Sequence, residues 1–597
     1  MIRHGQNHPV CARFAARLLL AAVLCLPLAE ATAAAAHDLR VVIDISGSMK
    51  QTDPLNLRVP ALRLLSELLP PDTEAGVWTF GQWVNMLVAH GEVTKKWKDL
   101  ARIEAAKISS VALFTDIGQA LQRATRGWEG PAEGQRRSLI LLTDGHVDID
   151  KNPELNGRAR AQILGVRLPA LIAAGVTLYP VGLSDNADQE LLETLARETG
   201  GLHQTARRAD DLHRIFMNIL EQSTEVNTLP IVEGGFEVDA AIDELNIVVF
   251  RNDGGRVALR DPAGSEMTRD SRPRAVRWFE ENPYAVITVP DPQEGRWQIL
   301  TEPHPDNRVF IISRLQLLPE ALPDTLFAGE ELTLRARLVD GETPIEDTGV
   351  LQLLKTQAVI EHEQDATSFW PLQPTDDPGN FQGNGRFAGR TGLSSILFVA
   401  EGPTFHRSAR RLVTLAPSPF SARWEGPSWV GKAGRITLQA SSADFASDEL
   451  GLTVLWTGPG AARHGSETRL PVGGSQSLLF APAQPGAYQA QVAVAGISAD
   501  GRGLLIHLPP VSVDAVVEPE VSPPPPPEPE PVAVSEPAPI SVPAPRPVMA
   551  DGIEGRWWLG FGVINLLLVP GALYYALRTR RRDTAAMAQR LEELEAS

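Results

Sequence analysis

Cysteine is nearly absent from this chain, because only Cys11 and Cys25 occur among its 597 residues. Both lie in an N-terminal stretch with the pattern of a secretory signal, so we expect no thiol in the mature protein. Disulfide bonds are therefore excluded as the source of stability in an exported compartment. Cysteine nucleophiles are excluded for the same reason.

Local motifs of common enzyme classes are also missing. The chain has no Gly-x-Ser-x-Gly elbow, no Walker A loop and no His-Glu-x-x-His pair. The formal net charge is -18, because 73 Asp and Glu residues outnumber 55 Lys and Arg residues. This charge disfavours nucleic acid or an anionic lipid surface as the main partner. We expect a binding protein rather than an enzyme, with no small-molecule substrate.

The first 36 residues are predicted to be a signal peptide. Arginines precede a short apolar run, Leu18 to Leu28, and the small residues that end at Ala36 fit a cleavage site. The apolar run is too short for a stable membrane span, so removal is favoured. An uncleaved N-terminal anchor is the alternative.

Long apolar runs are rare, and the one good candidate for a membrane span lies near the C-terminus. Residues 557–577 contain no charged side chain and are numerous enough for a membrane helix. Aromatic residues lie near both ends, and an arginine cluster begins at Arg578. The positive-inside rule then places the tail, 578–597, in the cytoplasm. A buried core helix is the alternative.

A proline-rich segment, 516–550, precedes this span. It contains the run Pro523 to Pro527 and alternating Pro-Glu pairs. Proline cannot donate a backbone hydrogen bond, so the segment favours an extended polyproline form. We interpret it as a disordered stalk. A ligand for a proline-recognising domain is the alternative.

Between signal and stalk, residues 37–224 alternate strand-like and helix-like patterns. Nearly continuous apolar runs such as Leu39 to Ile45 and Ser138 to Thr143 are typical of strands buried on both faces. The pattern from Ala159 to Ala174 predicts a helix kinked at Pro169. The series predicts an α/β fold with a doubly wound parallel sheet, in which ligands bind at the carboxyl ends of the strands.

Polar residues gather at those strand ends. Asp44, Ser46 and Ser48 close the first strand as Asp-x-Ser-x-Ser, Thr115 precedes a helix, and Asp144 follows a buried strand. Alone, Asp-x-Ser-x-Ser is a weak signal, because such loops are common helix caps. Here three segments lie at sheet edges that are predicted to adjoin, so their oxygen atoms are expected to meet.

These five residues match the metal-ion-dependent adhesion site of von Willebrand factor A domains, and residues 37–224 resemble that family throughout. The resemblance implies that two serines and a threonine supply hydroxyl oxygens to a metal, while the two aspartates act directly or through water. A partner's oxygen, often from a carboxylate, completes the coordination. Such hard donors with few anionic ligands suit Mg²⁺ best, with Mn²⁺ and Ca²⁺ as alternatives. A structural site that never meets an external ligand is the other interpretation.

Further side chains lie close to the motif in sequence. Asp116 either hydrogen-bonds a metal ligand or caps its helix. His146, Asp148 and Asp150 follow Asp144 in alternation, and they either extend the ligand-binding face, form a second cation site or belong to a solvated loop. Trp83, between two strand-like runs, is either exposed at a loop or packed in the core.

After Ser223 the pattern changes to short strands broken by Gly, Pro and Asp turns, with no long helix before the candidate span. We predict three β-sandwich modules of immunoglobulin-like size, at 225–318, 319–415 and 416–515. The expected role of these modules is spacing and rigidity. A second binding surface is the alternative.

The whole layout resembles bacterial membrane-anchored von Willebrand A proteins. It implies an inner-membrane protein with its large N-terminal body in the periplasm. We expect it to bind an unidentified protein ligand through the metal. One alternative is a membrane-bound assembly or accessory subunit of a larger complex. A metallohydrolase is a third interpretation, because a metal with open coordination can activate water.

Overall fold

The computed structural model describes residues 37–518 with nine short gaps. The gaps are 133, 209–210, 252–254, 362–367, 388–390, 441–444, 447–448, 462 and 499–500. The predicted signal peptide, nearly all of the predicted stalk, the predicted span and the predicted tail lie outside the described residues. Within the described part, no helix is long and apolar enough to cross a membrane.

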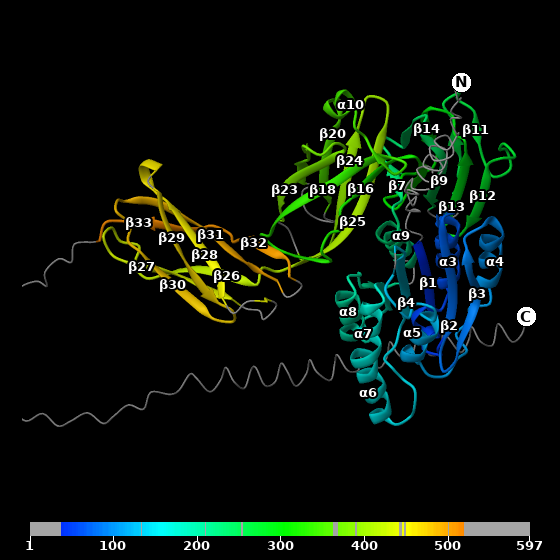
Figure 1. Cartoon of the computed structure of the whole chain (residues 1–597), viewed down its shortest axis with the longest axis horizontal. Coiled ribbons are helices and arrows are strands. Elements are labelled where there is room, and N and C mark those ends of the chain that lie inside the picture. The colour runs from blue at the N-terminus through cyan, green and yellow to red at the C-terminus, as the bar shows by residue number, and fades with distance from the viewer. Residues whose placement is uncertain are drawn as a thin grey trace, which may run out of the picture. The chain divides into compact units, whose positions relative to one another are not determined.

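The N-terminal part is an α/β structure built on a six-stranded sheet with the order β3-β2-β1-β4-β5-β6 (Figure 1). The strands are β1 (His37–Asp44), β2 (Thr73–Phe80), β3 (Val84–Glu92), β4 (Arg136–Thr143), β5 (Val176–Leu183) and β6 (Gln204–Ala206). Neighbouring strands are parallel except β2 and β3, which are antiparallel. The sheet is therefore mixed rather than fully parallel, because the short turn after Phe80 can join only antiparallel strands.

Helices cover both faces of this sheet. They are α2 (Met49–Thr52), α3 (Arg58–Leu68), α4 (Lys95–Ala105), α5 (Ile117–Ala124), α6 (Pro153–Gln162), α7 (Leu168–Ala173), α8 (Gln189–Glu198) and α9 (Leu212–Ser223). Alternate side chains of β1 face opposite sides. Leu39, Val41 and Ile43 share a core with α3, α4 and α9, whereas Val42 shares one with α5, α7 and α8. This two-sided burial explains the nearly continuous apolar runs of the central strands.

The helix predicted to kink at Pro169 is interrupted immediately before that residue. A single π-helical turn, η1 (Ile163–Arg167), separates α6 from α7, and Pro169 lies in the first turn of α7. Proline lacks the N–H that an α-helix would use at this point, and its ring would crowd the preceding turn. The wider turn accommodates both effects.

The rest of the described chain consists of short strands and one short helix, α10 (Thr348–Leu353). The first sandwich contains β7 (Asn227–Leu229), β8 (Gly235–Val238), β9 (Ile242–Phe250), β10 (Leu259–Arg260), β11 (Glu266–Met267), β12 (Arg277–Glu281), β13 (Tyr284–Pro290), β14 (Gly295–Ile299) and β15 (Arg308–Ser313). The second contains β16 (Leu315–Pro319), β17 (Thr325–Phe327), β18 (Glu331–Asp340), β19 (Thr343–Pro344), β20 (Lys355–Glu361), β21 (Ser368–Pro371), β22 (Gln373–Pro374), β23 (Asn380–Arg386), β24 (Gly392–Glu401) and β25 (His406–Ala416).

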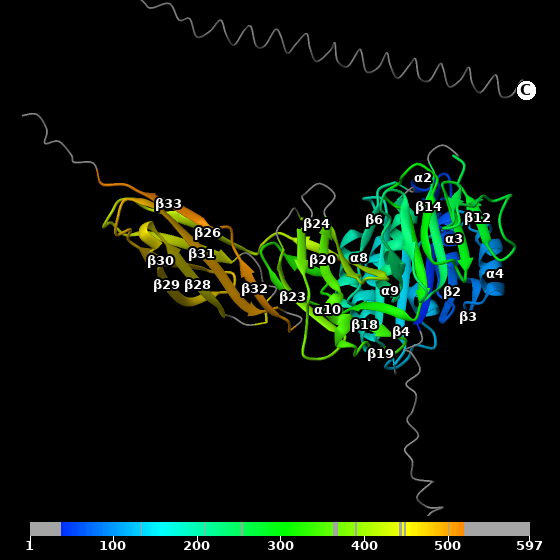
Figure 2. The same ribbon diagram turned by 90° about the horizontal axis from the view of Figure 1, so that it is seen from above.

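The third sandwich contains the 3₁₀ turn η3 (Pro459–Ala461) and eight strands, drawn in yellow to orange in Figure 2. These are β26 (Phe420–Glu425), β27 (Gly434–Ala440), β28 (Glu449–Thr457), β29 (Arg463–Pro471), β30 (Ser475–Phe480), β31 (Gly486–Ile497), β32 (Gly503–His507) and β33 (Val511–Ala515). Each sandwich has an apolar core of its own. The first two also share one ten-stranded sheet, in which β7 joins β15 to β25.

The first sandwich shares a core with the α/β part. On β15, Val309 and Ile311 face the interior of the sandwich, whereas Phe310 between them packs with α3, α4 and α9. Strands β9 and β13 follow the same alternation, and the hydroxyl of Tyr284 on β13 donates to the Pro60 carbonyl oxygen at 2.7 Å. One sheet is therefore buried on both faces, which joins the two parts through an apolar interface.

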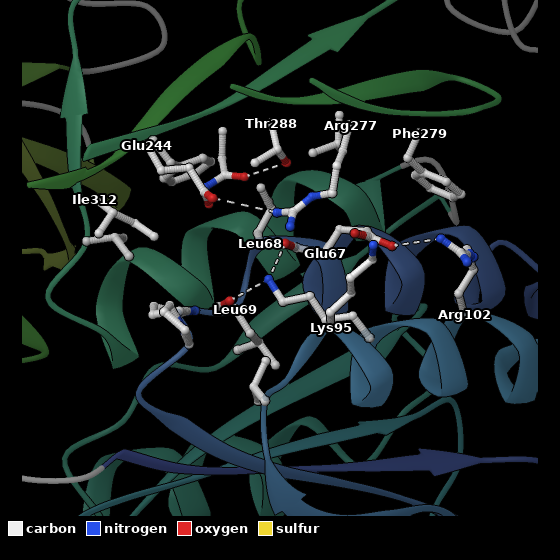
Figure 3. A pocket seen from close by; sticks show the side chains of 18 of the residues that line it. Glu67, Leu68, Leu69, Lys95, Arg102, Glu244, Arg277, Phe279, Thr288 and Ile312 are labelled. Carbon is white, nitrogen blue, oxygen red and sulfur yellow. Dashed lines mark hydrogen bonds and ion pairs between the residues drawn. The ribbon is translucent and has the colours of Figure 1, made fainter. Parts of the chain in front are cut away.

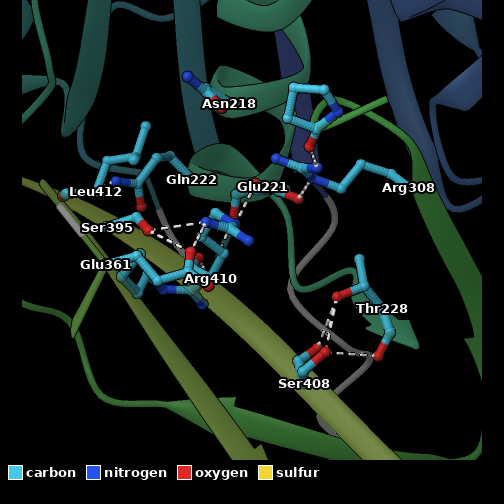
Figure 4. Close-up of polar contacts among 12 residues, drawn as sticks. Asn218, Glu221, Gln222, Thr228, Arg308, Glu361, Ser395, Ser408, Arg410 and Leu412 are labelled. Atoms are coloured by element: carbon cyan, nitrogen blue, oxygen red, sulfur yellow. Dashed lines mark hydrogen bonds and ion pairs between the residues drawn. The ribbon is translucent and has the colours of Figure 1, made fainter. Parts of the chain in front are cut away.

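Ion pairs also connect the α/β part to the first two sandwiches (Figure 4). Glu221 on α9 has only 3% of its surface exposed, and its carboxylate lies 3.6 Å from both Arg308 on β15 and Arg410 on β25. Arg410 also bonds Glu361 at 2.6 Å. Buried charges require such partners, because an isolated one would have to lose its hydration without compensation. The last helix of the α/β part is thereby tied to both of the first two sandwiches.

Replacing Phe310 with Ala is expected to lower the free energy of unfolding by about 3–5 kcal/mol, because a large buried aromatic side chain is lost from the shared core. Denaturant unfolding of the full chain measures the change. The control is Leu479→Ala, since Leu479 is 73% exposed and its removal should cost at most about 0.5 kcal/mol. Equal effects of the two substitutions would show that the interface contributes little.

Candidate metal centre

The predicted metal-site residues come together at the carboxyl ends of β1 and β4. These neighbouring strands are the point where the strand order reverses, since β2 and β3 continue on one side and β5 and β6 on the other. In open α/β sheets, ligands bind outside the carboxyl ends of the strands at such a point. Asp44 is the last residue of β1 and Asp144 directly follows β4.

Asp44 is fully buried and both of its carboxylate oxygens accept hydrogen bonds. Oδ1 accepts from the Ser46 backbone N–H at 2.7 Å, and Oδ2 accepts from the Thr143 hydroxyl at 2.6 Å. Burial nevertheless raises the pKa of the Asp44 carboxyl to about 6. The negative charge is therefore poorly solvated, and a nearby cation would stabilise it.

The serine hydroxyls link this strand end to Asp144. The Ser46 and Ser48 hydroxyl oxygens are 3.0 Å apart, and the Ser48 hydroxyl donates to Asp144 Oδ1 at 2.8 Å. Asp144 Oδ2 accepts from the Thr52 hydroxyl at 2.7 Å. Thr52 is a site residue that the motif did not reveal. Its position four residues after Ser48, on the same side of a helical turn, is the signal that could have found it.

Thr115 lies in the loop before α5, close to the same strand ends. It is 5% exposed, and a Cβ built on Gly145 would lie 3.7 Å from its hydroxyl oxygen. Its backbone pairs with Asp148 through two hydrogen bonds, of 2.6 and 3.1 Å. The preceding Phe114 has φ 61°, a conformation that is uncommon for residues other than glycine. The loop is therefore held in one specific conformation beside Asp144.

The three neighbouring side chains have other partners. Asp116 caps α5 by accepting from the Gln119 backbone N–H at 2.8 Å. The Asp148 carboxylate accepts from Asn156 at 3.0 Å, and His146 lies 3.7 Å from Asp188 with 69% of its side chain exposed. Asp116 thus has the helix-capping contact, and His146 and Asp148 are exposed.

Arg58 is the residue that holds the surrounding loops in place. Its side chain is fully buried at the start of α3. It donates to the Asp44 carbonyl oxygen at 2.7 Å, to the Asp53 carboxylate at 2.7 Å, to the Asn56 side chain at 2.9 Å and to the Ser110 hydroxyl at 2.8 Å. One guanidinium therefore connects the end of β1, the loop before α3 and the loop before α5. No local pattern marks Arg58 in the sequence, because Asp44 and Ser110 are far from it along the chain.

The assembled side chains fit a hard divalent cation. All of the predicted donors are oxygens, and only two of them, on Asp44 and Asp144, come from carboxylates. Asp44, Thr115 and Asp144 are buried, whereas Ser48 is exposed, so the group opens to solvent on one side. Mg²⁺ combines one or two carboxylates with other oxygens and retains positions for water or a partner's oxygen.

A second cluster with metal-ligand chemistry lies at the opposite end of the sheet. Ligand atoms of Asp38, Glu74 and His90 lie within 4.8 Å of one another. However, Asp38 already accepts from Arg40 at 2.8 Å, from Trp128 at 2.8 Å and from His90 at 2.9 Å. The Arg40 guanidinium would repel a cation, so we interpret this cluster as a structural ion-pair network.

A pocket lies where α3 and α4 meet the first sandwich (Figure 3). Its charged side chains pair with one another: Arg277 lies 3.7 Å from Glu244 and Arg102 lies 3.4 Å from Glu67. The Lys98 ammonium donates to two carbonyl oxygens that end α3, each at 2.8 Å, and burial lowers its pKa to about 8. Because these charged side chains already have partners, we interpret the pocket as part of the interface between the α/β part and the first sandwich.

The α/β part is similar in sequence to a known domain family. The sequence profile of the von Willebrand factor type A domain matches residues 38–218. A protein of Mycolicibacterium vanbaalenii described as "UPF0353 protein" is 26% identical over 235 residues, which are 34% of this chain and 70% of the relative. The UPF0353 protein of Mycolicibacterium gilvum is 25% identical, with the same shares. A solved von Willebrand factor type A structure from Catenulispora acidiphila is 12% identical, with a TM-score of 0.28, over 64% of this chain and 67% of that chain.

The fold is that of an α/β domain with a mostly parallel sheet. Residues 38–218 belong to the von Willebrand factor type A family. The predicted resemblance is thereby confirmed for this domain.

Replacing Arg58 with Met is expected to lower the free energy of unfolding by about 3–5 kcal/mol, because the buried Asp53 carboxylate would lose its partner. Thermal and denaturant unfolding of the full chain measure this change. The control is Arg197→Met on α8. Arg197 pairs with Glu198 and both side chains are largely exposed, so its loss should cost at most about 1 kcal/mol. If the two variants unfold alike, the central role of Arg58 is wrong.

Proposed function

We propose that this chain is an exported, membrane-anchored binding protein whose von Willebrand factor type A domain holds a divalent cation, most favourably Mg²⁺. The observation that carries the proposal is the continuous oxygen network from Ser46 through Ser48 to Asp144, beside the buried Asp44. Three separate segments of the chain supply these oxygens at the carboxyl ends of β1 and β4. Such an arrangement has no evident use in a helix cap alone.

The residues have distinct roles in this proposal. Ser46, Ser48 and Thr115 offer neutral hydroxyl oxygens, while Asp44 and Asp144 supply the negative charge. The bound ion would supply a coordination position for an oxygen of a protein partner. Neutral donors leave the ion short of negative charge, which favours a carboxylate as the partner's group.

Binding is favoured over hydrolysis by the contacts of the same side chains. The hydrogen bonds to Asp44 and Asp144 come from hydroxyls and one backbone N–H. A general base must reach the proton that it abstracts. His146, the nearest histidine in sequence to Asp144, lies beside Asp188 instead. We therefore propose a binding role rather than an enzyme.

Membrane anchoring is the second part of the proposal and depends on the sequence pattern near the C-terminus. We propose that residues 557–577 cross a bacterial inner membrane, with the sandwiches as a rigid body between the membrane and the metal face. A C-terminal tag should then be protected from protease in spheroplasts, whereas the body should be digested. Cleavage of both parts, or of neither, would contradict this topology.

Ion binding is tested by titrating the EDTA-stripped full chain with Mg²⁺, Mn²⁺ and Ca²⁺ in a calorimeter. Ser48→Ala and Asp144→Asn are each expected to weaken Mg²⁺ binding by at least about 10-fold, because each removes an oxygen donor or its charge. The matched control is Ser475→Ala, an exposed serine on β30. If neither site variant changes the affinity, or if no ion binds the wild-type chain, the metal proposal is wrong.

Partner binding is tested by cross-linking the full chain to a periplasmic and membrane extract in Mg²⁺, in EDTA, and with the Ser48→Ala variant. A partner captured only in Mg²⁺ by the wild-type chain is the expected result. Equal capture under all three conditions would move the binding surface to the sandwiches. Capture that depends instead on the tail, 578–597, would favour the accessory-subunit alternative.

A further inference from the structure

Four large apolar side chains are exposed on the loops around the metal centre. Leu55, Trp83, Val111 and Leu113 have 77%, 67%, 72% and 67% of their surfaces exposed. We call these four residues the apolar rim. Single exposed apolar side chains are ordinary on protein surfaces, but a group of large ones on adjoining loops marks an interaction site.

Hydrogen bonds hold the loops of the apolar rim together. The loop that carries Leu55 contacts the loop before α5, because Asn56 donates to the Ile108 carbonyl oxygen at 2.7 Å. The Gln82 backbone N–H donates to the Leu113 carbonyl oxygen at 2.8 Å. Trp83 therefore directly follows a residue that is bonded to Leu113, and the residues of the apolar rim lie on loops that contact one another.

A close backbone approach shapes this edge. A Cβ added to Gly81 would lie 2.3 Å from the Ala112 Cβ, so only glycine permits the two loops to meet at this distance. Gly81 lies two residues before Trp83 in one loop, and Ala112 directly precedes Leu113 in the other. The apolar side chains of Trp83 and Leu113 are consequently presented on adjoining loops.

The apolar rim also borders the metal centre directly. Ser46 forms a β-bridge with Ala112, which lies between Val111 and Leu113. The Ala112 backbone N–H donates to the Ile45 carbonyl oxygen at 2.9 Å. A group bound at the Ser46 hydroxyl would therefore have the apolar rim on one side.

Acidic side chains also lie near the metal oxygens. Asp148 and Asp150 are exposed, and Asp148 pairs through its backbone with Thr115. These carboxylates would repel a second acidic group of a partner. The metal oxygens thus have both the apolar rim and exposed carboxylates near them. A partner that is acidic along its whole length is disfavoured.

We propose that the apolar rim binds bulky apolar side chains adjacent to the acidic residue that a protein partner presents to the metal. The recognised chemistry is one carboxylate flanked by aromatic or large aliphatic residues. This inference rests on the proposed function, because it takes the metal-bound carboxylate as the anchor. Burial of apolar surface then supplies the selectivity between acidic partners.

Two labelled peptides test the inference on the full chain, with binding measured by fluorescence anisotropy in Mg²⁺ and in EDTA. One is Gly-Trp-Glu-Leu-Gly and the other is Gly-Ser-Glu-Ser-Gly, so both offer one carboxylate side chain. In Mg²⁺ the apolar peptide is expected to bind about tenfold more tightly, because its two large side chains bury apolar surface. EDTA should abolish this binding.

The variant for this test combines Trp83→Ser with Leu113→Ser. It is expected to reduce the preference to at most about twofold while Mg²⁺ affinity stays unchanged, because neither residue contributes an oxygen donor. The matched control combines Leu353→Ser with Leu479→Ser, which are 65% and 73% exposed on the sandwiches. This control should keep the full preference.

The outcomes separate this inference from the proposed function. Equal Mg²⁺-dependent binding of both peptides would overturn the role of the apolar rim and leave the metal-dependent binding role standing. Apolar binding that persists in EDTA, or adsorption of the apolar rim to neutral lipid vesicles without metal, would overturn the coupling between rim and ion. Failure of both peptides to bind while Mg²⁺ still binds would overturn both the rim and the carboxylate partner. Absence of Mg²⁺ binding by the wild-type chain would overturn the proposed function and, with it, the coupling between rim and ion.

Discussion

The buried guanidinium of Arg58 is the interaction on which the metal face depends. A buried charge needs paired donors, and here the partners come from the end of β1, the loop before α3 and the loop before α5. Backbone and side-chain hydrogen bonds connect the same segments, including the bond from the Ala112 N–H to the Ile45 carbonyl oxygen. The end of β1 carries Asp44, and the loop before α5 carries Thr115, Val111 and Leu113. The buried charge and these hydrogen bonds together position the oxygens and the apolar side chains.

A second constraint acts behind the face. The sheet of β9, β13 and β15 buries one side in its own sandwich and the other against α3, α4 and α9. A protein interior packed on both sides resists small displacements, because side chains interlock at near-crystalline density. The α/β domain is therefore packed directly against the first sandwich. Its last helix, α9, is held by apolar packing and by the ion pairs of Glu221.

In the proposed binding mode, selectivity would come from the side chains around the ion. A metal held by neutral hydroxyls and two carboxylates would attract any accessible anionic oxygen, so the ion alone would discriminate poorly between partners. Exposed apolar side chains and exposed carboxylates near the ion would add requirements for shape and charge. Specific recognition commonly combines attraction with a repulsive element. In this chain the two elements lie on adjoining loops, because Thr115, two residues after Leu113, pairs with Asp148.

Much of the α/β domain could be predicted from the sequence, because its signals are local. The runs at Leu39 to Ile45 and Ser138 to Thr143 reflect the burial of central strands, and Asp44, Ser46, Ser48, Thr115 and Asp144 lie where the ends of those strands meet. The exposed position of Trp83 stayed undecided, since a tryptophan fits a core equally well. The helix break at η1 was foreshadowed by Pro169, whose geometry acts within one turn.

Other features depend on residues that are distant in the chain, and only the folded structure reveals them. In the sequence, Arg58 has the pattern of an ordinary helix residue. Only the folded structure shows that Asp44, Asp53 and Ser110 surround it. The apolar strands around Val248, Val286 and Phe310 lack alternation because they have two buried faces, yet only packing shows that the second face belongs to the α/β domain. The antiparallel β3 and the shared sheet of the first two sandwiches have the same origin. Local sequence determines where strands and turns form and which polar residues lie at the strand ends. Which surface packs against which is determined by the whole fold, because apolar area must be buried and buried charges must be paired.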